Sequence, residues 1–107
     1  MRLNPYPPSF YYNRLGHAYA LMNRYDEAIE MCKKGFRRQA SDLYSRLVLA
    51  AVYIWQGRKE AAQVEVSEIL EAFPHYSLGL IKKYASMRNK EDLNRLIEAW
   101  RKAGIPE

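Results

Sequence analysis

The stretch LGHAY at residues 15–19 recurs in modified form as LAAVY at residues 49–53, and this repetition decides the fold. The first leucines of the two stretches lie one period apart (49 − 15 = 34), and the same period separates Asn23 from Gly57 and Ala28 from Ala62. A period of this length, with large and small residues at fixed offsets, is typical of two-helix units that stack side by side.

Each copy supplies what a helical hairpin requires. Asn23 and Gly57 tolerate a left-handed backbone, so each can form the tight turn between two helices. Ala28 and Ala62 then face a small residue of the preceding helix, such as Gly16, and allow the two backbones to approach closely. The pattern therefore predicts two consecutive helical hairpins.

Together with Tyr25 and Pro74, these residues resemble the tetratricopeptide repeat. Full copies cover residues 9–42 and 43–76. The resemblance implies an all-α fold, a short right-handed solenoid of three stacked antiparallel helix pairs, in which residues 77–104 form a divergent capping pair. We expect residues 9–107 to be one domain, preceded by a proline-rich entry segment at residues 1–8.

The sequence also indicates where the later helices begin and end. We expect a third helix that starts after Ser41 or Asp42 and ends before Gly57, and a fourth from residue 59 to residue 72. A fifth should run from residue 77 to residue 87, and a sixth from an N-cap at Asn89 to a stop at Gly104. The last helix has apolar residues at i, i+3, i+4 and i+7, so it should seal the open end of the solenoid. Those residues are Leu93, Leu96, Ile97 and Trp100.

Composition narrows the classes of protein. Hydrophobic residues make up 49% of the 107 residues, which is enough for a folded core. The single cysteine excludes an intramolecular disulfide and favours a reducing compartment. No apolar run is long enough to span a bilayer, and no signal peptide is visible, so we predict a cytoplasmic protein without a membrane partner. The net charge of +5 permits an acidic partner.

The sequence does not group the residue types that metal binding or catalysis requires. His17 and His75 have no acidic or cysteine neighbours at ligand spacing, so we expect no metal site. Cys32 has no local base, and we interpret it as a small buried hydrophobic residue. Glycine-rich phosphate loops and isolated carboxylate pairs are also missing. We therefore predict no cofactor, no catalytic residue and no small-molecule substrate, and hence a protein that is not an enzyme.

A basic cluster offers one alternative. Lys33, Lys34, Arg37 and Arg38 share one face of the second helix, an arrangement that could contact nucleic acid. The same residues also complement the dipole at the C-terminal end of that helix. Because no nucleic-acid recognition motif accompanies them, we predict a partner other than nucleic acid.

The family resemblance implies a concave face formed by the first helix of each pair. Family members that hold a peptide's C-terminal carboxylate use Lys and Asn there, and only Asn13 partly fits, so the groove is expected to be apolar and aromatic. It would bind a protein or peptide, or a second copy as a homodimer. Packing between neighbouring repeats is the other interpretation of residues such as Tyr44, Leu47 and Trp55. For His17 the alternative is a half-buried histidine with a satisfied hydrogen bond, and the two interpretations are equally supported. The predicted binding residues are Phe10, Asn13, His17, Leu21, Tyr44, Leu47, Ala51, Ile54, Trp55 and Ile81.

A second resemblance concerns the end of the chain. Residues 91–107, which finish in RKAGIPE, resemble the C-terminal end of multidomain bacterial adenylate/guanylate cyclases that carry tetratricopeptide repeats. This resemblance implies an alternative function, a regulatory or oligomerisation fragment of such a cyclase.

Overall fold

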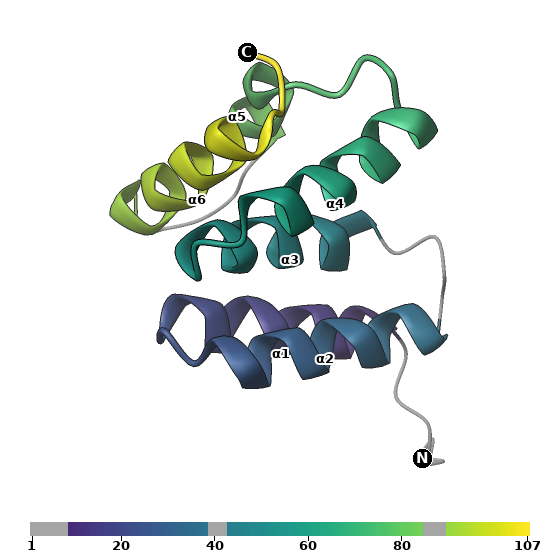
Figure 1. Ribbon diagram of the computed structural model, residues 1–107, viewed down its shortest axis with the longest axis vertical. Helices are drawn as coiled ribbons and strands as arrows, with labels where there is room; N and C mark the ends of the chain where they lie inside the picture. The colour runs from purple at the N-terminus through teal and green to yellow at the C-terminus, as the bar shows by residue number, and fades with distance from the viewer. Residues whose placement is uncertain (1–8, 39–42, 85–89) are drawn as a thin grey trace.

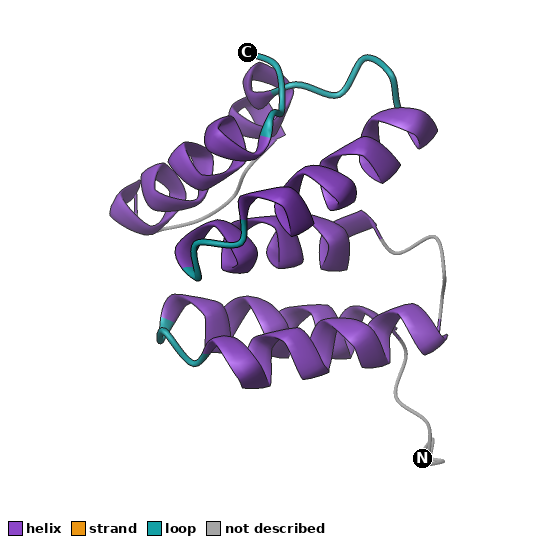
Figure 2. Cartoon of the chain, viewed as in Figure 1, coloured by secondary structure: helices purple, strands orange, loops and turns teal. Residues whose placement is uncertain are grey.

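The computed structural model describes residues 9–38, 43–84 and 90–107, and within these ranges every regular element is an α-helix (Figure 2). Three helix pairs lie in successive layers from the N-terminus to the C-terminus (Figure 1). The predicted all-α architecture of stacked helix pairs is confirmed. In the described residues the helices are α1 (Ser9–Leu21), α2 (Tyr25–Arg38), α3 (Leu43–Trp55), α4 (Lys59–Ala72), α5 (Leu78–Tyr84) and α6 (Lys90–Ala103).

The turns inside the first two pairs have the left-handed backbone that the repeat pattern predicts. Asn23 has a φ angle of 62° and Gly57 a φ angle of 77°. Glycine adopts this region without steric cost, and asparagine does so more readily than most residues. The two positions that are one period apart therefore play the same part in the backbone.

The equivalence of the two hairpins extends to hydrogen bonds and side chains. The amide of Arg24 donates to the carbonyl of Tyr19 at 2.9 Å, and the amide of Arg58 donates to the carbonyl of Tyr53 at 2.7 Å. The guanidinium carbon of each arginine also lies over the ring of that tyrosine, at 4.9 and 4.6 Å from the ring centre. A cation over an aromatic face is attractive, so each turn is closed in the same way.

Helices α1 and α2 approach closely at Gly16. A Cβ atom on Gly16 would lie 2.7 Å from the Cys32 sulfur and 3.3 Å from the Ala28 carbonyl oxygen. Cys32 and Ala28 are both fully buried. The sequence-based interpretations of Cys32 as a buried hydrophobic residue and of Gly16 as a contact between backbones are confirmed.

The third pair is divergent because α6, and not α5, packs against α3 and α4. In the apolar stripe of α6, Leu96, Ile97 and Trp100 are buried and Leu93 is partly buried. The indole nitrogen of Trp100 donates to the Leu47 carbonyl at 2.8 Å. Helix α5 is described as far as Tyr84, and the last predicted residues of this helix, 85–87, lie outside the described residues. Its first amide, that of Leu78, donates to the carbonyl of Pro106 at 2.7 Å. The proposed N-cap Asn89 and the entry segment at residues 1–8 lie outside the described residues.

None of the helices in the described ranges is long and apolar enough to cross a membrane.

Candidate functional site

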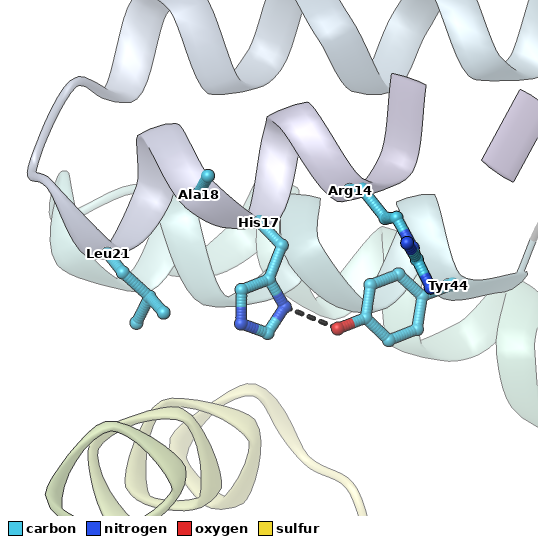
Figure 3. A pocket seen from close by; sticks show the side chains of 5 residues that line it. All are labelled: Arg14, His17, Ala18, Leu21 and Tyr44. Carbon is cyan, nitrogen blue, oxygen red and sulfur yellow. Dashed lines mark hydrogen bonds between the residues drawn. The ribbon is translucent and has the colours of Figure 1, made fainter. Parts of the chain in front are cut away.

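A hollow of about 650 Å³ opens on the side of α1 that faces α6. Figure 3 shows its lining, and we call this site the inner hollow: Arg14, His17, Ala18, Leu21 and Tyr44. Four of these residues belong to α1, where spacings of three and four positions place side chains on one face. Tyr44 comes from the start of α3, so the hollow exists only because the first two repeats stack.

His17 and Tyr44 form the floor of the inner hollow as a hydrogen-bonded pair. The Tyr44 hydroxyl contacts His17 Nδ1, and the rings are nearly parallel, with centres 5.7 Å apart and planes inclined by 7° (Figure 3). Burial raises the pKa of Tyr44 to about 12, so its hydroxyl keeps its proton at neutral pH. A phenol is a better donor than an imidazole N–H, and an imidazole nitrogen is the better acceptor, so we assign the hydroxyl as the donor.

The charge state of His17 follows from its surroundings. Burial lowers the pKa of His17, and the negative charge of Asp92 on α6 opposes this shift in part. The imidazole is therefore neutral at pH 7. Because Nδ1 accepts the hydrogen bond from Tyr44, the ring proton is on Nε2, which remains a donor.

Among the described lining residues, Arg14 carries the positive charge, and it is exposed at the rim. Within residues 9–38, 43–84 and 90–107, no carboxylate lies within ion-pair distance of its guanidinium. Three other arginines do have carboxylate partners: Arg24 pairs with Glu27, Arg46 with Glu65, and Arg101 with Glu98 and Glu107.

The structure brings together only part of the predicted binding set. His17, Leu21 and Tyr44 share the inner hollow, and Tyr44 is 40% exposed. Leu47 and Ala51 are instead in the core, with exposures of 5% and 0%, because the inner side of α3 packs against α6. They are not part of an open surface.

The remaining predicted residues lie away from the hollow or beyond what is described. Ile54, Trp55 and Ile81 are partly buried against the core. The side chains of Phe10 and Asn13 lie outside the described part of the chain. Sequence reasoning missed Arg14 and Ala18, although Arg14, His17 and Leu21 follow helical spacing and could have been grouped on that basis.

A second cluster, centred on Arg95 of α6, closes the inner face near the first turn. The guanidinium donates to the Asn23 side-chain oxygen, to the Leu21 carbonyl at 3.3 Å and to the Tyr25 hydroxyl at 3.3 Å. It also lies 4.2 Å from the centre of the Trp55 ring. We call these residues the Arg95 cluster. One side chain thus connects all three helix pairs.

Replacing Arg95 with Ala is expected to lower the free energy of unfolding by about 1–2 kcal/mol, because a cation–π contact and three hydrogen bonds are lost together. Urea titration followed by circular dichroism measures the change. Arg95→Lys should lose part of this amount, since an ammonium cannot reproduce the planar fork. The control, Lys102→Ala on the exposed side of α6, should stay within about 0.5 kcal/mol. Equal effects of Arg95→Ala and Lys102→Ala would show that the cluster is not stabilising.

The basic face of α2 remains a weaker candidate for a binding surface. Lys33 and Arg37 are exposed, whereas Lys34 lies 3.7 Å from a Glu30 carboxylate oxygen. The Arg38 side chain lies outside the described part. In the residues that the structure describes, no group of three or more metal-ligating side chains comes together.

Comparison with known proteins supports one family. Residues 9–42 match the family model of the tetratricopeptide repeat, which covers α1, α2 and the turn between them. Repeats of this family generally serve protein–protein interaction and are generally non-catalytic. No curated protein matches the chain. No solved structure matches it.

Proposed function

We propose that the chain is a non-catalytic interaction module that holds a segment of a partner polypeptide in the inner hollow. The observation that carries this proposal is the hollow itself, an open, largely apolar concavity lined by a few polar side chains. Sites of this form are the usual place for a ligand. The match to the tetratricopeptide repeat supports a polypeptide as that ligand.

The proposed surface is smaller than the sequence predicted. It leaves out Leu47 and Ala51, which are in the core, and Trp55, which lies beneath Arg95. It adds Arg14 and Ala18. The proposal keeps the division into an entry segment and one repeat domain, and the cytoplasmic location, as they were predicted.

Selection of a random peptide library on the immobilised protein tests this function. We expect the selected peptides to shift the backbone amide NMR signals of residues 14–21 and of Tyr44. Tyr44→Ala should lower the affinity for these peptides at least tenfold, since tyrosines in interfaces often carry much of the affinity. Phe73→Ala is the matched control, because Phe73 is an aromatic residue that is 51% exposed at the end of α4. Peptides that shift only residues elsewhere, or that bind Tyr44→Ala unchanged, would contradict the proposal.

A second copy of the chain is the alternative occupant of the same hollow. Size-exclusion chromatography with light scattering at several concentrations measures self-association. A dimer that Tyr44→Ala disrupts and Phe73→Ala preserves would assign the hollow to self-assembly.

The resemblance of residues 91–107 to the end of bacterial adenylate/guanylate cyclases supports an alternative function, as a regulatory or oligomerisation segment of such an enzyme. These residues form α6 and the tail that follows it. A cyclase domain encoded upstream in the same reading frame would establish this alternative, and another upstream gene would remove it.

A further inference from the structure

We infer that the inner hollow binds the side-chain carboxylate of an acidic residue in the partner segment, with an apolar residue about three positions away seated at Leu21. The inference rests on the proposed function, because it names the ligand chemistry of the same site. It follows from the hydrogen-bonding character of the lining, from an arginine at the rim that has no carboxylate partner among the described residues, and from the spacing along α1.

The polar side chains of the inner hollow can offer hydrogen-bond donors to a ligand. The Arg14 guanidinium has donors and no acceptor. His17 uses Nδ1 to accept from Tyr44, so the nitrogen left for a ligand is Nε2, which carries a proton. The Tyr44 hydroxyl proton is already engaged in that bond. A ligand that satisfies these groups must bring acceptors. At Arg14 a carboxylate can accept with both of its oxygens. Nε2 of His17 lies on the side of its ring away from Tyr44 and Arg14, so it would take a separate acceptor of the ligand (Figure 3).

The positive charge of Arg14 also favours a carboxylate ligand. Its guanidinium has no carboxylate partner in the described ranges, although it stands beside the partly buried His17–Tyr44 pair. A carboxylate can bind a guanidinium through two parallel hydrogen bonds, and a lysine would not provide that geometry. A neutral acceptor would bring no opposite charge to Arg14.

The spacing along α1 sets the distance between the two groups of the ligand. Arg14 and Leu21 are seven residues apart on one helical face, which corresponds to about 10 Å at 1.5 Å per residue. A polyproline-type segment rises about 3.1 Å per residue and repeats its face every third residue. An acidic and an apolar residue three positions apart in such a segment would therefore reach Arg14 and Leu21 together.

The same geometry favours a side-chain carboxylate over a chain terminus. A segment that contacts both ends of the hollow runs along α1, and it meets Arg14 at the exposed rim. A side chain can reach that position from a segment that continues past it. The terminal carboxylate is the competing source, and the experiment separates the two.

Asp92 acts against an acidic ligand. Asp92 of α6 acts on His17, and Arg14, Cys32 and Tyr76 act on Tyr44, so Asp92 is the carboxylate among the groups that act on the His17–Tyr44 pair. Removing that charge with Asp92→Asn is expected to tighten binding of an acidic probe two- to threefold. Asp92→Asn should not tighten binding of a neutral probe.

The test uses peptides that are acetylated at the N-terminus and amidated at the C-terminus, so that they carry no terminal charge. The probes are Gly-Leu-Pro-Pro-Glu-Gly and its reverse, each with a matched form in which Gln replaces Glu. We expect the better Glu probe to bind the full chain at least tenfold more tightly than its Gln form, as measured by NMR titration. Arg14→Gln should remove this difference, and Arg37→Gln, which changes an exposed arginine on α2, should preserve it.

A second readout separates direct contact from a general charge effect. A carboxylate bound in the inner hollow at Arg14 brings a negative charge toward His17 and favours its imidazolium form, so the Glu probe should raise the pKa of His17 in a titration of its ring protons, and the Gln form should not. Equal binding of the Glu and Gln forms at the hollow would overturn the inference and leave the proposed function standing. Tight binding of the Gln form only when its C-terminus is free would assign the site to a terminal carboxylate. If neither probe shifts residues 14–21 while library peptides do, the inference also fails.

Discussion

Replacing Trp100 with Ala is expected to lower the free energy of unfolding by about 3–5 kcal/mol, the range for truncating a large aromatic residue in a core. Trp100 is 5% exposed and lies where α6 packs against α3. Its indole nitrogen also donates to the Leu47 carbonyl at 2.8 Å. The substitution removes both the packing and the hydrogen bond. Because small domains are stable by only about 5–15 kcal/mol, such a loss would remove a large share of the total stability.

Urea titration of Trp100→Ala and Trp100→Phe, followed by circular dichroism, separates the two contributions. Phe retains most of the apolar contact area but has no N–H, so it should lose about 1–2 kcal/mol. A loss below about 1 kcal/mol for Trp100→Ala would mean that α6 is not needed to hold α3, and that the capping role of α6 is wrong.

Replacing Gly16 with Ala is expected to destabilise the chain by about 1–3 kcal/mol through overpacking. This stability change is opposite in sign to the usual effect of Gly→Ala, which stabilises an open helix by about 1 kcal/mol. At Gly16 the new methyl group would lie 2.7 Å from the Cys32 sulfur and 3.3 Å from the Ala28 carbonyl oxygen, so the Cys32 side chain must move or α1 and α2 must separate slightly. The cost arises at the contact on which the first repeat depends.

A double-mutant cycle with Cys32→Ala tests this explanation. Removing the sulfur should make room for the methyl group, so the double variant should be more stable than the sum of the single changes predicts, by about 1 kcal/mol or more. Gly79→Ala on α5 is the control, since its Cβ would have no neighbour closer than 3.8 Å and should be neutral or slightly stabilising. If Gly16→Ala is tolerated as well as Gly79→Ala, the close approach is not tight.

The repeat fold could be predicted from the sequence because its determinants are local and recur. The left-handed turns at Asn23 and Gly57 and the small residues that face each other across a hairpin follow from one spacing. Helix α4 has the predicted bounds, since a turn residue precedes it and Pro74 follows it. Each of these features is decided within a few residues of the chain.

The candidate site was harder to predict because it depends on where α6 packs. The repeat pattern alone places Leu47 and Ala51 on an open concave wall, and nothing near them in the sequence shows that α6 makes them part of the core. The pairing of His17 with Tyr44 joins residues of two repeats, so it too requires the stacked structure. Contacts between distant residues have no periodicity from which they could be recognised.

The Arg95 cluster has a consequence for how the molecule comes apart. In a simple array each repeat touches only its neighbours, so the terminal repeats can unravel while the rest stays ordered. Here a hydrogen bond links Arg95 to Asn23, residues that are 72 positions apart. Opening the last pair therefore also loosens the first, and amide hydrogen exchange in α2 and α6 should report one cooperative event with a shared protection factor.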